Sequence, residues 1–266
     1  MSRLSSKLND RLQSGSKSLV AYIVAGDPEP GITVGLMHEL VRNGVDVIEL
    51  GVPFSDPEAE GPVIQLAHER ALAHQVSLAD CLDMVRAFRA DDHETPIVLM
   101  GYLNPIEAMG YRAFTERAAA AGVDGTIIVN LPPEEAGEFT GLMEQADIET
   151  VYLLAPTTTN ERAEMVCQAS RGFVYYVSLK GTTGASTLDL GDVSEKIARF
   201  RQYTQLPLMV GFGVKDAETA RSVAAIADGA VVGSAIVSLM EKHREDPQTL
   251  NREVGRFVAG LRSALG

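Results

Sequence analysis

Cysteine is scarce in this sequence. Cys81 and Cys167 are the two cysteines among 266 residues, and their spacing matches no metal-binding or redox motif. Both lie within segments of helical periodicity. The scarcity excludes a disulfide framework and indicates a reducing compartment in which both thiols are buried or inert.

Basic residues are also few. The chain has 23 Lys and Arg against 36 Asp and Glu, which gives a formal net charge of -13. A protein that binds nucleic acid or an anionic membrane needs a basic face, so we expect neither partner. An anionic ligand would have to be held by local hydrogen-bond donors.

Long apolar runs are missing. The longest, Ala230–Met240, is interrupted by Gly233 and two serines and is too short to span a bilayer. The N-terminal segment MSRLSSKLNDRLQSG lacks the apolar core of a signal peptide. Its leucines at positions 4, 8 and 12 predict a short amphipathic helix that ends before Gly15. We therefore expect a cytoplasmic protein.

Short apolar runs alternate with longer segments of helical periodicity, a pattern typical of βα units and a parallel sheet. The predicted strands lie near Leu19–Val24, Val47–Leu50, Ile97–Met100, Thr126–Val129, Val151–Leu154, Val174–Val177, Leu208–Val210 and Ala230–Val232. Three junctions place Gly and Asp just before a strand: NGVDVIEL from Asn43, AGVDGTIIV from Ala121 and IADGAVVG from Ile226. They predict helix ends that lead directly into strands.

Eight βα units in about 250 residues is the size of a TIM (β/α)8 barrel. No Ser/Pro-rich linker or block of charge divides the chain, so residues 1–266 are predicted to form a single TIM-barrel domain. In addition to the eight βα units, we expect the N-terminal helix and extra helices after the second and eighth strands. A doubly wound open sheet is the alternative, because periodicity does not reveal whether a sheet closes.

The loop after the second strand is long and acidic, and long loops in compact domains are usually functional. In a barrel, catalytic residues lie at the C-terminal ends of strands, where Glu49 falls. Alternation puts Val47 and Glu49 on one face and Ile48 and Leu50 on the other, so Glu49 is predicted to point into the barrel mouth. A structural ion pair is the ordinary alternative for Glu49, and a turn hydrogen bond or simple solvation is the alternative for the loop carboxylates.

Two glycine motifs follow the seventh and eighth strands, GFGV at Gly211–Val214 and GSAIV at Gly233–Val237. Glycines let backbone N–H groups approach an oxyanion, and a helix N-terminus adds a favourable dipole. Either motif alone would more often mark a tight turn, but together, after strands seven and eight, they predict a phosphate-binding site of the kind found in TIM barrels, a phosphate cup. The Gly/Thr/Ser-rich segment SLKGTTGASTLDL, residues 178–190, is either a lid or an ordinary connection. The five histidines lack ligand spacing, so no metal site is predicted.

These motifs carry a resemblance that covers nearly the whole chain in order. ELGVPFSDPEAEGPVIQ, the GDP at Gly26–Pro28, the Gly/Thr loop, GFG and GSAIV resemble the tryptophan synthase alpha subunit family. The resemblance implies a TIM barrel that cleaves indole-3-glycerol phosphate to indole and glyceraldehyde 3-phosphate without a cofactor of its own. It also implies a pyridoxal-phosphate-dependent beta subunit as partner, in an alpha2beta2 complex.

The resemblance further implies residue roles. Glu49 would move a proton to the indole ring carbon, Glu60 would accept a hydrogen bond from the indole N–H, and Tyr175 matches an active-site position. The remaining matched positions are Tyr102, Thr183 and Phe212 beside the substrate, Gly184, Gly213, Gly233 and Ser234 at the phosphate, and Pro53 and Asp56 facing the beta subunit.

Two positions depart from the family pattern, which has Asp where this chain has Glu60 and an apolar residue where it has Glu58. A glutamate at position 60 keeps the carboxylate but moves it outward by about one methylene group. Two other functions therefore stay open at this point: another phosphate-binding barrel enzyme of the same pathway, and a ligand-sensing subunit with weakened catalysis that regulates a partner.

Overall fold

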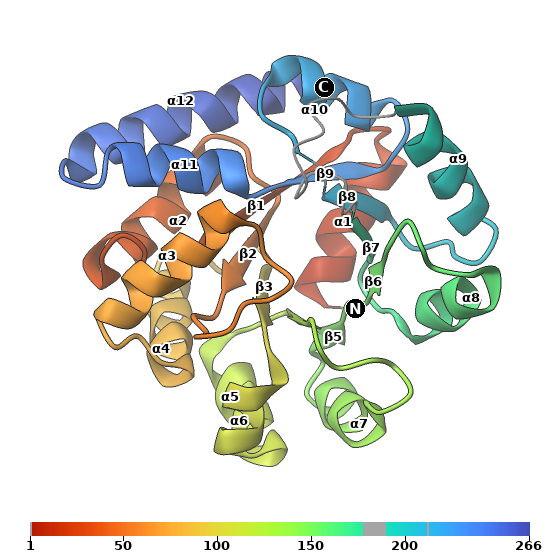
Figure 1. Ribbon diagram of the computed structural model, residues 1–266, viewed down its shortest axis with the longest axis horizontal. Coiled ribbons are helices and arrows are strands. Elements are labelled where there is room, and N and C mark those ends of the chain that lie inside the picture. Colours follow the sequence, from red (N-terminus) through yellow and green to blue (C-terminus); the bar gives the residue numbers. More distant parts are fainter. Residues whose placement is uncertain (1, 178–189, 212) are drawn as a thin grey trace.

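The strands form one sheet in which every pair is parallel (Figure 1). The structure is a computed structural model that describes residues 2–177, 190–211 and 213–266. Along the sheet the order is β5-β4-β3-β2-β1-β9-β8-β7-β6. The strands are β1 Ser18–Val24, β2 Val47–Gly51, β3 Ile97–Gly101, β4 Gly125–Ile128, β5 Glu149–Thr150, β6 Leu153–Leu154, β7 Val174–Val177, β8 Leu208–Gly211 and β9 Gly229–Val232.

The two ends of this sheet meet in one short segment of chain. In place of the predicted strand Val151–Leu154 there are two short strands: β5 lies just before the predicted start and pairs with β4, and β6 covers the last two predicted residues and pairs with β7. Between them the Val151 N–H donates to the Thr126 carbonyl at 2.9 Å, and the Tyr152 carbonyl accepts from the Tyr175 N–H at 3.2 Å. The segment therefore turns from one neighbour to the other and closes the sheet into a barrel. This confirms the predicted fold class and excludes the doubly wound open sheet.

Helices surround the ring of strands (Figure 1). Their bounds are α1 Arg3–Gln13, α2 Thr33–Arg42, α3 Pro62–Ala73, α4 Leu78–Arg89, α5 Leu103–Met109, α6 Tyr111–Ala121, α7 Gly137–Gln145, α8 Asn160–Ala169, α9 Leu190–Phe200, α10 Ala217–Ala224, α11 Ser234–Lys242 and α12 Pro247–Leu265, with a short 3₁₀ turn at Pro30–Ile32. The predicted extra helices are present, since α3 and α4 both follow β2 and α11 and α12 both follow β9.

The N-terminal helix α1 closes the end of the barrel where the strands begin. Leu4 and Leu8 are buried in one apolar cluster with the inward-facing residues of the strands, among them Val20, Val47 and Val98. Leu12, on the same predicted face, remains 41% exposed. The inner cluster fills the lower barrel with branched side chains, so the open space lies at the opposite end.

The three Gly/Asp junctions share one tertiary contact. Each aspartate uses its Oδ2 to accept the backbone N–H at the start of the neighbouring strand. The pairs are Asp46 with Leu19 at 2.9 Å, Asp124 with Ile97 at 2.8 Å and Asp228 with Leu208 at 2.8 Å. The glycines at 44 and 122 have φ of +95° and +88°, the left-handed conformation that ends a helix.

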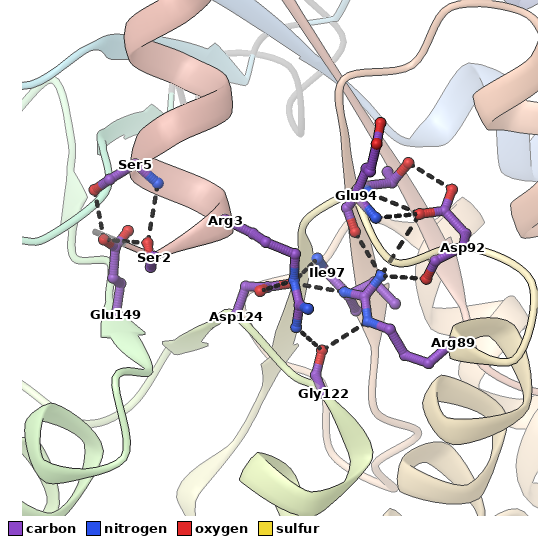
Figure 2. A network of polar contacts seen from close by, with 11 residues as sticks. Ser2, Arg3, Ser5, Arg89, Asp92, Glu94, Ile97, Gly122, Asp124 and Glu149 are labelled. Atoms are coloured by element: carbon purple, nitrogen blue, oxygen red, sulfur yellow. Dashed lines mark hydrogen bonds and ion pairs between the residues drawn. The ribbon is translucent and has the colours of Figure 1, made fainter.

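Arginines pair with all three aspartates. Asp124 pairs with Arg3 and with Arg89, each at 2.7 Å, and both arginines also donate to the Gly122 carbonyl (Figure 2). Ser2 and Ser5 donate to Glu149 beside this group (Figure 2). These contacts hold α1 against the starts of the strands, at the end of the barrel opposite the open space.

Candidate active site

A cavity of about 330 Å³ lies at the C-terminal ends of the strands. It is lined from β1, β2, the loop after β2, the start of α3, β3, β7, β8, the segment after β8, β9 and the start of α11. The lining residues are Tyr22, Glu49, Ala59, Glu60, Gly61, Pro62, Val63, Ile64, Met100, Tyr175, Val177, Gly211, Gly213, Val214, Val231, Gly233 and Ser234. Six of the residues singled out in the sequence therefore share one cavity: Glu49, Glu60, Tyr175, Gly213, Gly233 and Ser234.

Glu49 lies in the middle of β2 with its carboxyl group buried. Its neighbours Ile48 and Leu50 pack on the helices outside the barrel, as the alternation predicted. Glu49 is 1% exposed, and neither carboxyl oxygen has a hydrogen-bond partner among the described residues. Burial, followed by the negative charge of Glu60, raises its pKa to about 8. A carboxyl group with that pKa can release and recover a proton near neutral pH.

Glu60 lines the same cavity, and its charge acts on Glu49. Burial raises the pKa of Glu60 to about 7. Its loop neighbour Glu58 is exposed, as expected of a solvated carboxylate. The cavity thus holds two carboxyl groups with raised pKa values, and no Lys or Arg is among the described residues that line it.

Two phenols reach into the cavity over glycines. A methyl group placed on Gly51 would lie 2.4 Å from the Tyr22 Oη, and one placed on Gly211 would lie 2.3 Å from the Tyr175 Oη. These glycines end β2 and β8, the strands beside β1 and β7. Burial raises the pKa of both tyrosines well above the usual value, and nearby Glu49 and Glu60 add to the effect. Both phenols therefore keep their protons.

Gly213, Gly233 and Ser234 of the predicted phosphate cup line the same cavity. Gly233 is the N-cap of α11, and Ser234 is its first residue. The first N–H groups of a helix have no partner within it, so they are available to an anion. Gly213 has φ +38° and no atom within 4 Å of the position of a Cβ. The start of α11 therefore brings backbone N–H groups without helical partners to the cavity wall.

The loop after β2 is held by several contacts. Tyr102, predicted beside the substrate, accepts a hydrogen bond from the Ala59 N–H at 3.0 Å and does not line the cavity. Its ring stacks on Phe54 with centroids 4.9 Å apart. Gln65 donates to the Glu60 carbonyl at 2.9 Å. These contacts fix the backbone on either side of the Glu60 side chain.

The other predicted site residues are distributed as follows. Thr183, Gly184 and Phe212 lie outside the described residues, and so does all of the predicted lid 178–190 except its last residue, Leu190. Of the two residues predicted to face a partner, Pro53 is buried and Asp56 is exposed. Sequence reasoning missed Tyr22 as a cavity residue, although its position on the inward face of the first strand follows from the same alternation that selected Glu49.

Neither a metal cluster nor a membrane span is found in the part of the chain that the structure describes. Residues 2–177, 190–211 and 213–266 contain no group of three or more His, Cys, Asp or Glu side chains arranged to hold a metal ion. Within the same ranges no helix is both long enough and apolar enough to cross a bilayer.

Known proteins resemble this chain over its whole length. The sequence model described as "Tryptophan synthase alpha chain" matches residues 8–265. A relative of that name from Nitrosococcus oceani is 52% identical over 265 residues, covering 100% of this chain and 98% of the relative. Tryptophan synthase subunit alpha from Legionella pneumophila has a solved structure with TM-score 0.93 and 46% identity, covering 100% of this chain and 98% of that one. A chain of the tryptophan synthase complex from Pyrococcus furiosus has TM-score 0.84 and 36% identity, with 93% and 99% covered.

Proposed function

Since the chain belongs to the tryptophan synthase alpha chain family and is a carbon–carbon lyase that cleaves indole-3-glycerol phosphate in tryptophan biosynthesis, we propose that Glu49 carries the protons of that cleavage. The observation that supports this role is the isolation of its carboxyl group. Glu49 is buried in the cavity, has no hydrogen-bond partner among the described residues and has a pKa raised to about 8.

The reaction requires one proton transfer from Glu49 and one proton transfer back to it, so the protonation state of Glu49 does not change overall. Protonated Glu49 gives its proton to the ring carbon that bears the side chain, and the ring becomes a cation. The resulting carboxylate then takes the proton of the adjacent side-chain hydroxyl. The oxygen forms the aldehyde C=O, the carbon–carbon bond breaks, and its electron pair returns to the ring to give neutral indole. One residue with a pKa near the working pH performs both steps because it ends in the form in which it began.

Glu60 is proposed to act on the ring nitrogen. Its carboxylate would accept the indole N–H hydrogen bond, which strengthens when the ring becomes a cation. Glu49 is fully buried, whereas Glu60 is only partly buried, so the charged form is disfavoured more at Glu49. This difference in burial favours Glu49 as the acid and Glu60 as the anion, a division of roles typical of paired carboxyl groups. Tyr175 is proposed as a neighbouring hydrogen-bond donor from β7.

The phosphate group is proposed to bind at Gly213, Gly233 and Ser234, with Gly184 as a further contact. The unpaired N–H groups at the start of α11 and the absence of cations from the described cavity lining support a backbone-based site. A substrate held there would extend its indole toward Glu49 and Glu60. Thr183 and Phe212 are proposed to contact the substrate as well.

We also propose that the chain works with a pyridoxal-phosphate-dependent beta subunit in an alpha2beta2 complex. A structural relative of this chain is part of a tryptophan synthase complex. The loop with Pro53 and Asp56 would face the partner, and Asp56 is the exposed member of the pair. Crosslinks from Asp56 to the beta subunit would support this, and a complex with the partner at the α1 end of the barrel would contradict it.

A cytoplasmic location and a single domain over residues 1–266 belong to the same proposal. Cys81 and Cys167 are separate, buried free thiols, which suits a reducing compartment. The test of the function is an assay for indole released from indole-3-glycerol phosphate, with and without a beta subunit. Binding of the substrate without turnover in either condition would instead favour the ligand-sensing alternative.

A further inference from the structure

A buried histidine connects three separate elements beside the cavity. His68 lies on α3 and is 2% exposed. Its Nδ1 accepts a hydrogen bond from the Phe54 N–H at 3.0 Å, and its Nε2 lies 3.2 Å from the Tyr22 Oη. Phe54 belongs to the loop after β2 and Tyr22 to β1. His68 therefore links the first barrel strand to the loop that carries Glu60.

These contacts determine which nitrogen of His68 holds its proton. The Phe54 N–H can only donate, so Nδ1 must present a lone pair and carries no proton. The imidazolium form, with a proton on both nitrogens, would set two donors against each other at Nδ1. Burial lowers the pKa of His68 to about 4, which agrees with a neutral ring. The proton is therefore on Nε2, which donates to the Tyr22 oxygen.

Tyr22 consequently keeps its own hydroxyl proton free. Its oxygen accepts from His68, and no described residue accepts its O–H. The phenol lies over Gly51, at the point where β2 passes into the loop, and Tyr22 lines the cavity with Glu60. After burial, the charge of Glu60 is the largest influence on the pKa of Tyr22. A free donor thus stands near the Glu60 carboxyl group.

The same histidine ties both ends of the loop. Phe54 is near the start of the segment between β2 and α3, and His68 is on the helix that begins at Pro62, two residues after Glu60. Joining these ends to Tyr22 limits the positions that Glu60 can take. A carboxylate must be held to within a fraction of an ångström to act on a bound ring.

We propose that His68 and Tyr22 are positioning residues for Glu60: His68 braces the loop and orients the phenol, and Tyr22 donates its O–H to the Glu60 carboxylate when the site is occupied. This inference rests on the proposed role of Glu60. His68 thereby has a proposed role, although the spacing of the histidines in the sequence had indicated none.

The titratable groups around Glu60 come from four elements. They are Tyr22 on β1, Glu49 on β2, Tyr102 after β3 and Tyr175 on β7. His68 acts through Tyr22. A hydrogen bond to a carboxylate stabilises its charged form, so removal of the Tyr22 O–H would raise the pKa of Glu60. Activity that needs ionised Glu60 would then begin at higher pH.

The experiment is a double-mutant cycle on the full chain. Tyr22→Phe, Glu60→Gln and the double variant are compared by kcat for indole release, which reports the pKa values of the substrate-bound enzyme, over a pH range that spans the pKa values of about 7 and 8. Tyr22→Phe is expected to lose roughly tenfold below the pKa of Glu60, the size of one hydrogen bond to a charged group. The loss should shrink as the pH rises, and Tyr22→Phe should add nothing in the Glu60→Gln background. His68→Phe should show the same pattern.

Tyr152→Phe is the matched control. It removes another buried phenol, one that pairs with Thr140 away from the cavity, and should leave kcat and its pH dependence unchanged. The inference would be overturned if Tyr22→Phe lowered the rate by the same factor at every pH. It would also be overturned if the effects of Tyr22→Phe and Glu60→Gln on the rate multiplied in the double variant. Either result would leave the role of Glu60 intact. Full activity of Glu60→Gln would overturn both the inference and that role.

Discussion

Glu49 on β2 lies directly opposite Tyr22 on β1 in the parallel ladder, and both side chains line the cavity at the barrel mouth. One carries a carboxyl group without a hydrogen-bond partner among the described residues, and the other carries a hydroxyl proton without an acceptor there. The Glu49 carboxyl group is therefore available to a ligand, and the Tyr22 hydroxyl proton is available to Glu60.

Glu49→Gln should nearly abolish cleavage, because the amide keeps the shape of the side chain but cannot transfer the proton. General acid–base groups contribute about 10²–10⁴ in rate, so kcat should fall by that range. Binding of glyceraldehyde 3-phosphate, measured by calorimetry, should survive. Near-normal indole release by this variant would remove Glu49 from the mechanism, and Glu58→Gln provides an exposed carboxyl control.

Substitutions at Glu60 and at Glu58 should have very different effects on catalysis, although the two residues are only two positions apart. Glu60→Ala should lose about 10²-fold or more in kcat/KM, since it removes a carboxylate that would stabilise the ring cation. Glu58→Ala should change little because Glu58 is exposed. Glu60→Asp should remain active, since loop adjustment can absorb about one methylene group. If Glu58→Ala were the crippling change, the two roles would be reversed.

Gly213→Val should raise KM by crowding the proposed phosphate cup, with a smaller effect on kcat. Gly110→Val is a matched control, because both glycines have positive φ, +38° and +86°, and neither has an atom within 4 Å of a Cβ position. Gly110 follows α5, away from the cavity lining. Steady-state kinetics of both variants separate the effect of backbone strain from the effect of blocking the phosphate site. Equal KM values for the two variants would contradict the phosphate assignment.

The buried carboxyl group of Glu49 should make stability fall as pH rises. Its pKa is about 8 in the folded protein and 4.5 as the ordinary value, so between these values the folded state retains a proton that the unfolded chain has lost. Each pH unit in that window weakens folding by up to about 1.4 kcal/mol per group. Glu49→Gln should therefore have a Tm that exceeds the wild-type Tm by more at the alkaline end of the window than at the acid end.

Thermal unfolding of both proteins across that window measures this effect. Glu58→Gln, which changes an exposed carboxyl group, should keep a constant difference from wild type. A Tm difference between Glu49→Gln and wild type that does not change with pH would show that Glu49 ionises normally. Such a result would also weaken its assignment as a proton donor at neutral pH.

Local sequence patterns determined the repeating parts of this protein. The β-branched runs specify strands because their side chains suit a buried pleated surface. The alternation of side chains along β2 directs Glu49 into the barrel, whereas Ile48 and Leu50 pack on its outside. The glycines at 44 and 122 end helices because their φ is positive, a conformation that other residues rarely adopt. Each of these choices depends on neighbours within a few positions in the chain.

Tertiary structure decided the contacts between distant segments. The division of residues 149–154 between two neighbouring strands appears only when the sheet closes. The Gly/Asp junctions predicted helix ends, yet the ion pair between Asp124 and Arg3 joins residues 121 positions apart. The partnership of His68 with Tyr22 and the raised pKa of Glu49 likewise depend on which groups burial brings together and removes from water. Periodicity reports the direction of a side chain, whereas distance, desolvation and hydrogen-bond partners are set by the packed chain as a whole.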